Sequence, residues 1–245
     1  MGIVHRIGAT FKQMTWKEHL VYWVLPIVIS WILAIMYFMG PLWMQNLTAH
    51  SYNREFGILE NLENILLLGV IIISFILLKN APNLTLKSIY LLCLGASVFM
   101  LLEEIDYGFH LYNYYKGIHP QEDTVIRNIH NQGKNTIKIL MWTGYAIILL
   151  FILVMPHVNK KKLPAWLVDF VPSIKLHFTV LSLPFISRFP HILNSMNFET
   201  NMSLYHNLSE FEEFAIYYIF FLFFYEMKKR QERKSEYESS QTSTV

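Results

Sequence analysis

The sequence is poor in cysteine and in charged residues, and both shortages narrow the class of protein. A single cysteine among 245 residues excludes a disulfide framework and a cysteine-ligated metal cluster. Only 16% of the residues are charged, whereas soluble domains carry about 25%. The net charge of +2 provides no basic field for nucleic acid. Hydrophobic residues make up 53% of the chain, and this composition indicates an integral membrane protein.

Common catalytic motifs are also absent. The chain has no G-x-S-x-G, H-E-x-x-H, P-loop or G-x-G-x-x-G sequence, and the E-x-x-H signature of di-iron bundles is missing around Glu103 and His110. Any activity must therefore come from side chains that the fold brings together.

Long apolar runs predict helices that cross a membrane, which need about 20 mostly apolar residues each. Six stretches meet or approach this length: 19–39, 57–78, 86–105, 137–155, 174–190 and 210–226. We predict an all-α integral membrane helical bundle with about six transmembrane helices. It would form one domain over residues 1–234, followed by a polar, disordered tail over 235–245.

The charged residues predict an orientation for this bundle. With six spans, 14 of the 20 Lys and Arg residues lie on the side of the two termini, which the positive-inside rule makes cytoplasmic. Without the weak span 174–190, the basic C-terminal tail would lie outside. Twelve of the 18 acidic residues lie on the opposite side, in outer loops or outer helix ends.

Some of these acids lie within the spans, at one depth on three different helices. They are Glu60 and Glu63, Glu103 and Glu104, and Glu213. An ionisable group at membrane depth is costly and marks a functional site by default. Clustered carboxylates suit divalent metals and general acid–base chemistry. The sequence therefore predicts a carboxylate site at the outer ends of the helices.

Structural explanations stand beside this prediction. Acids in a first helical turn favour the helix dipole, which would account for Glu60 and Glu63. An S-x-x-E capping box accounts for Glu212 and weakens the case for Glu210. Glu103 and Glu104 are different, because they end an apolar helix, where the dipole disfavours acids.

Further polar residues follow the third span. Spacings of three, four and seven residues would put four of them on one face of a helix that continued past the membrane. These are Glu103, Asp106, Tyr107 and His110. The outer loop beyond them adds His130 and Asn131.

Three sequence blocks carry a family resemblance. They are 53–60 (NREFGILE), 102–110 (LEEIDYGFH) and 128–133 (NIHNQG). They resemble an uncharacterised family of bacterial multi-pass membrane proteins with E-E-I-[SD]-[WY]-G and [LI]-H-N blocks, in which Ser-Trp is frequent where this chain has Asp-Tyr. The resemblance implies a bacterial inner (plasma) membrane protein and brings no established activity. It also implies that a single site contains Glu60, Glu103, Glu104, His130 and Asn131.

These features favour a metal-assisted hydrolase or transferase acting on a lipid or lipid-linked substrate, with membrane lipids as partners and a divalent metal ion as cofactor. The expected catalytic residues are Glu103, Glu104 and His130. The expected metal ligands are Glu60, Glu103, Glu104, His110 and His130. Residues expected to contact the substrate or support the site are Arg54, Glu60, Glu63, Asp106, Tyr107, Asn131 and Glu213.

Two other classes remain open from the sequence. The acids could form a structural network in a non-catalytic membrane subunit or scaffold. They could also serve a proton- or cation-coupled transporter, although the central parts of the spans carry almost no ionisable residues.

Overall fold

The computed structural model describes residues 2–118, 135–204 and 207–242, and every regular element in this part of the chain is helical. This confirms the all-α prediction. Three helical stretches are long and apolar enough to cross a membrane, namely Trp16–Met39, Ile58–Lys79 and Leu84–Glu104. A shorter apolar helical stretch covers Trp142–His157.

Helices occupy all six of the ranges predicted from the apolar runs. The long ones are α3 (Leu25–Met39), α5 (Ile58–Lys79), α6 (Leu84–Glu104), α8 (Asn135–Val154), α10 (Leu176–Ser195) and α11 (Glu210–Thr242). The shorter elements are α1 (Ile3–Gln13), α2 (Trp16–His19), α4 (Leu42–Thr48), α7 (Phe109–Lys116), α9 (Ala165–Val168), the π-helical turn η1 (Leu20–Val24) and the 3₁₀ turns η2 (Arg54–Phe56), η3 (Asp106–Gly108), η4 (Met155–His157) and η5 (Lys160–Lys162).

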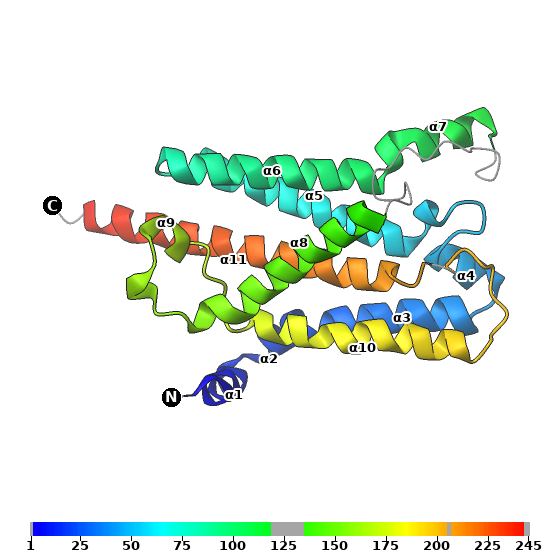
Figure 1. Ribbon diagram of the computed structural model, residues 1–245, viewed down its shortest axis with the longest axis horizontal. Coiled ribbons are helices and arrows are strands. Elements are labelled where there is room, and N and C mark those ends of the chain that lie inside the picture. Colours follow the sequence, from blue (N-terminus) through cyan, green and yellow to red (C-terminus); the bar gives the residue numbers. More distant parts are fainter. Residues whose placement is uncertain (1, 119–134, 205–206, 243–245) are drawn as a thin grey trace.

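The long helices share one general direction. In Figure 1, α3, α5, α6, α10 and α11 run along the longest axis, α8 crosses them obliquely, and both termini lie at the same end. Helix α11 runs on to Thr242, well into the segment predicted to be a disordered tail. An ion pair between Lys228 Nζ and Glu232 Oε1 at 3.2 Å supports this polar part of the helix, because residues four apart are neighbours on a helix surface.

Helix α5 lies between α6 and α11 and packs against both. A Cβ added to Gly69 would lie 2.8 Å from the ring of Phe221, so the missing side chain lets α5 and α11 approach closely. Leu67, Val70 and Ile216 fill the adjoining part of this interface and are almost fully buried. The packing sets the start of α5, the start of α11 and the end of α6 at one end of the molecule.

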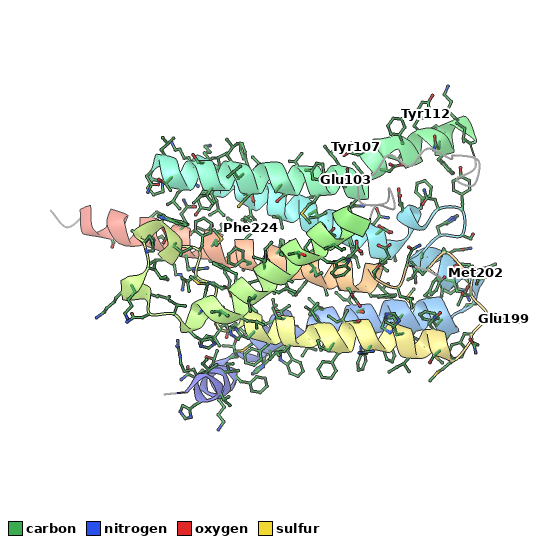
Figure 2. The ribbon with its side chains drawn as sticks, in the orientation of Figure 1. Glu103, Tyr107, Tyr112, Glu199, Met202 and Phe224 are labelled. Atoms are coloured by element: carbon green, nitrogen blue, oxygen red, sulfur yellow. The ribbon has the colours of Figure 1, made fainter. Side chains whose placement is uncertain are left out.

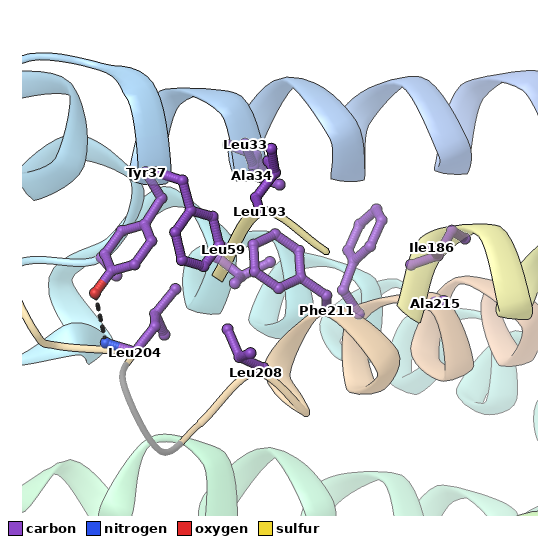
Figure 3. Packing of buried hydrophobic residues seen from close by; sticks show 13 residues of the cluster. Leu33, Ala34, Tyr37, Leu59, Ile186, Leu193, Leu204, Leu208, Phe211 and Ala215 are labelled. Atoms are coloured by element: carbon purple, nitrogen blue, oxygen red, sulfur yellow. Dashed lines mark hydrogen bonds between the residues drawn. The ribbon is translucent and has the colours of Figure 1, made fainter. Parts of the chain in front are cut away.

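A second apolar cluster joins α3, α10 and α11 at the same end (Figure 3). Tyr37 and Phe211 are among its largest fully buried side chains. The backbone N–H of Leu204 donates a hydrogen bond to Tyr37 Oη over 2.9 Å. This bond fixes the segment before α11 to α3, and with it the position at which α11 begins.

Proline explains the π-helical turn that precedes α3. Pro26 has no N–H and therefore leaves the carbonyl of Tyr22 without its helical partner. The hydroxyl of Thr179 on α10 donates to that carbonyl oxygen over 2.5 Å. The neighbouring carbonyl of Val21 accepts a hydrogen bond from Tyr218 Oη on α11 over 2.7 Å. The irregular turn thus connects α3 to both of its neighbours.

The start of α5 rests directly on the end of α4. A Cβ at Gly57 would lie 2.2 Å from Thr48 O and 2.6 Å from Ala49 Cα, and only glycine permits this approach. Helix α4 is itself fixed by Gln45, whose amide donates to Glu199 O over 3.1 Å and accepts from Asn201 N over 2.7 Å. The position of α5 along its own axis is therefore set by its contact with α4.

We expect Gly57→Ala to destabilise the protein by about 1–3 kcal/mol, because the new methyl group overlaps backbone atoms that have no room to move. Thermal unfolding of the purified protein in detergent measures this change. Gly95→Ala is the matched control, since a Cβ at Gly95 meets nothing within 4 Å. Equal effects of the two substitutions would contradict the packing described for Gly57.

Candidate functional site

Carboxylates from three helices converge at one end of the bundle. Oxygen atoms of Glu60, Glu63 and Glu210 all lie within 4.8 Å of one another, and the same is true of Glu63, Glu104 and Glu213. Glu63 belongs to both groups and lies at their centre. We call these five residues the carboxylate cluster.

Helical spacing explains how each helix contributes. Glu60 and Glu63 are three residues apart near the start of α5, so their side chains lie on one face. Glu210 and Glu213 repeat this spacing in the first turn of α11. Glu104 is the last residue of α6. Because α5 packs against both other helices, its two acids face the acids of α6 and α11.

Glu63 is the most deeply buried member of the cluster. Its exposed fraction is 0%, and neither carboxylate oxygen has a hydrogen-bond partner. Removing an ionised carboxylate from water costs several kcal/mol unless a partner compensates, and neighbouring carboxylates add repulsion. A carboxylate in this position therefore requires a cation or a proton close to it.

Tyrosines hold Glu104 in place. Tyr217 Oη on α11 donates a hydrogen bond to the Glu104 carboxylate, and Tyr145 Oη on α8 lies 3.5 Å from Tyr217 Oη. All three side chains are buried. The arrangement connects α6, α11 and α8, and it explains how an acid is tolerated at a helix C-terminus, where the dipole is unfavourable.

Glu103 takes a different direction from Glu104 and belongs to neither group of close carboxylates among the described residues. It is buried and accepts a hydrogen bond from Tyr107 Oη. Figure 2 shows this pair where α6 meets α7. The same hydrogen bond raises the pKa of the Tyr107 phenol, which keeps the phenol protonated as the donor.

The structure corrects the expectation of one continuous helical face beyond Glu103. Helix α6 ends at Glu104, and the next turn has positive φ angles at Asp106 (46°), Tyr107 (53°) and Gly108 (82°). Glycine adopts such angles without strain, so Gly108 favours a sharp change of direction here. Helix α7 then leaves at an angle to α6 (Figure 2).

The structure does not describe the side chains of four predicted site residues. His130 and Asn131 lie in 119–134, outside the described residues. Arg54 lies in η2 and His110 in α7, but the description does not extend to their side chains. The expected roles of these four residues stay predictions.

Three residues of the site, Glu210, Tyr217 and Tyr145, were not among the expected site residues. Glu210 was assigned to the start of the helix, although it lies three residues from Glu213 on the same face. The spacing of the sequence also puts Tyr217 on that face, but Tyr217 was not assigned to the site. Tyr145 gave no comparable indication, since nothing in its own segment relates it to the acids.

Comparisons with known proteins assign no family to the chain. No family model, no curated protein and no solved structure matches it. The site is therefore interpreted from its own geometry.

We expect Tyr217→Phe to destabilise the protein by about 1–3 kcal/mol, because the substitution removes a donor from the buried Glu104 carboxylate. Unfolding in detergent measures the effect. Tyr225→Phe is the control, because Tyr225 lies on the same helix and its ring is 40% exposed. A Tyr217→Phe protein as stable as this control would show that the hydrogen bond contributes nothing.

Proposed function

We propose that this chain is a multi-pass protein of the bacterial inner membrane, with six spans, cytoplasmic termini and the carboxylate cluster on the outer side. Three helices have the length and hydropathy of membrane spans, and helices also occupy the other three predicted ranges. Both termini lie at one end of the bundle, as an even number of crossings requires. The excess of basic residues at that end makes it the cytoplasmic one.

The carboxylate cluster binds a divalent metal ion in this proposal. The observation that carries it is Glu63, which is fully buried, lacks hydrogen-bond partners and lies within 4.8 Å of carboxylates from all three helices. Oxygen-only ligand sets favour hard cations such as Mg²⁺, Ca²⁺ or Mn²⁺. A bound cation would compensate both the burial of Glu63 and the repulsion between neighbouring acids.

The chemistry proposed for the site is metal-assisted hydrolysis or group transfer on a lipid or lipid-linked substrate. A metal ion polarises a substrate oxygen or lowers the pKa of a bound water molecule. The cluster lies at the ends of apolar helices, the depth at which a lipid headgroup meets the hydrocarbon region. Glu104 serves as a ligand or general base, Glu103 supports the site through Tyr107, and His130 on the outer loop serves as a ligand or proton shuttle.

A non-catalytic subunit is the second reading, and a specific observation favours it. The Glu104–Tyr217–Tyr145 contacts join three helices, which is what a structural network would do. A transporter has less support, because the middle turns of α3, α5 and α6 contain no charged residue that could continue a polar route.

We expect the purified protein to contain a divalent metal that is lost in Glu63→Gln. The substitution keeps the shape of the side chain but removes its charge, so metal affinity should fall by at least about tenfold. Metal analysis after dialysis measures this. The affinity should also fall on acidification, because protons compete with the metal for the carboxylates.

Glu199→Gln is the matched control, because Glu199 is an exposed acid on the loop before α11, away from the cluster (Figure 2). This variant should retain the metal. A chelator should lower the unfolding temperature of the wild type, by the linkage that stabilises a metal-bound state, and leave Glu63→Gln unchanged. Negligible metal in the wild type, with no effect of the chelator, would refute metal binding and leave the structural reading.

The topology can be tested through the single cysteine. In a Cys93→Ser background, we expect a membrane-impermeant maleimide to label Lys116→Cys in intact cells. The same reagent should label Lys161→Cys and Ser235→Cys only after permeabilisation. Labelling of Ser235→Cys in intact cells would place the C-terminal tail on the outer side and contradict the proposed topology.

A further inference from the structure

A second polar site lies at the opposite end of the bundle from the carboxylate cluster. A cavity of about 430 Å³ opens between the start of the first long helical stretch, the segment before α10 and the later turns of α11. Five cationic side chains line it: Lys160, Lys175, Lys229, Arg230 and Arg233. We call this cavity the basic pocket.

Both acids in the lining of the basic pocket already have ion-pair or hydrogen-bond partners. Glu18 forms an ion pair with Lys175. Glu226 is buried and accepts hydrogen bonds from Tyr22 Oη over 2.7 Å and from Ser173 N over 3.1 Å, as well as from the Ser173 hydroxyl. Five cations against two carboxylates leave a formal excess of three positive charges on the lining.

Arg230 is half-buried in this lining, and only some of its donors are used. Its Nη1 donates to Val171 O and its Nε donates to Glu226 O over 3.3 Å, but its buried Nη2 has no partner. Burial also lowers the pKa of the Arg230 guanidinium, because the cation is partly removed from water. Neither Lys160 nor Arg233 forms an ion pair within the described part of the chain. Lys160, Arg230 and Arg233 therefore have no carboxylate partner among the described residues, and their charges are not neutralised within the pocket.

We infer that the basic pocket binds a phosphate-bearing anion through the exposed side chains of Arg233 and Lys160, with the Arg230 guanidinium adding positive charge to the lining. A guanidinium presents paired N–H donors that match phosphate oxygens, and lysine adds a mobile positive charge. The volume is in the range of about 300–1,000 Å³ that small-ligand sites occupy.

Two sources could supply this phosphate. One is the headgroup of an anionic phospholipid, since the pocket lies at the polar end of the apolar helices. The other is a soluble phosphate compound that reaches the same end from water. The inference concerns residues outside the carboxylate cluster and holds whether or not that cluster binds metal.

The test compares the full-length wild type with two double variants in detergent. Lys160→Gln/Arg233→Gln removes two exposed cations from the lining. Lys161→Gln/Lys162→Gln removes the same charge from neighbouring lysines that do not line the pocket. Inorganic phosphate binding is measured by equilibrium dialysis, and binding of phosphatidylglycerol or phosphatidylcholine is measured by native mass spectrometry.

We expect the pocket variant to bind its anion at least about tenfold more weakly than wild type, while the control variant binds almost normally. Loss of phosphatidylglycerol binding, with phosphatidylcholine unaffected, assigns the pocket to a lipid headgroup. Loss of inorganic phosphate binding assigns it to a soluble phosphate compound. The inference is overturned if the wild type binds neither anion, or if the two double variants are equally impaired.

Discussion

The burial of Glu63 is the constraint on which the arrangement of this end of the molecule depends. A carboxylate with no exposed surface and no hydrogen bond is tolerated only if its surroundings supply positive charge or a proton. Acids from α6 and α11 surround it and increase the cost. A cation held between these carboxylates, or a proton on Glu63, would remove this cost, and packing alone does not.

The backbone around the cluster determines where the three acid-bearing helices begin or end. Gly57 allows α5 to begin directly against α4, and the positive φ angles after Glu104 stop α6 before its acids extend beyond the other helices. Tyr37 fixes the segment that leads into α11. The three helices thereby present their acids at the same height.

The sequence predicted the helices because apolar runs of membrane length leave few alternatives to helical structure. It also predicted that Glu60, Glu63, Glu103, Glu104 and Glu213 would meet, because their depths agree, and all of them except Glu103 belong to the two groups of close carboxylates. It did not predict the hydrogen bond between Tyr217 and Glu104, or the positive φ angles of the turn that follows α6. The depth of a residue can be read from its position in an apolar run, whereas the direction of its side chain around the helix axis depends on packing against neighbouring helices, which a single sequence does not record.

Helix α11 contributes to both polar sites of the protein, with Glu213 in its first turns and Arg230 beyond the apolar run. These residues are separated by about 26 Å along one uninterrupted helix. A helix resists compression along its axis, so a displacement of α11 along that axis moves both residues together. The two ends of the bundle are in this way mechanically connected by one helix.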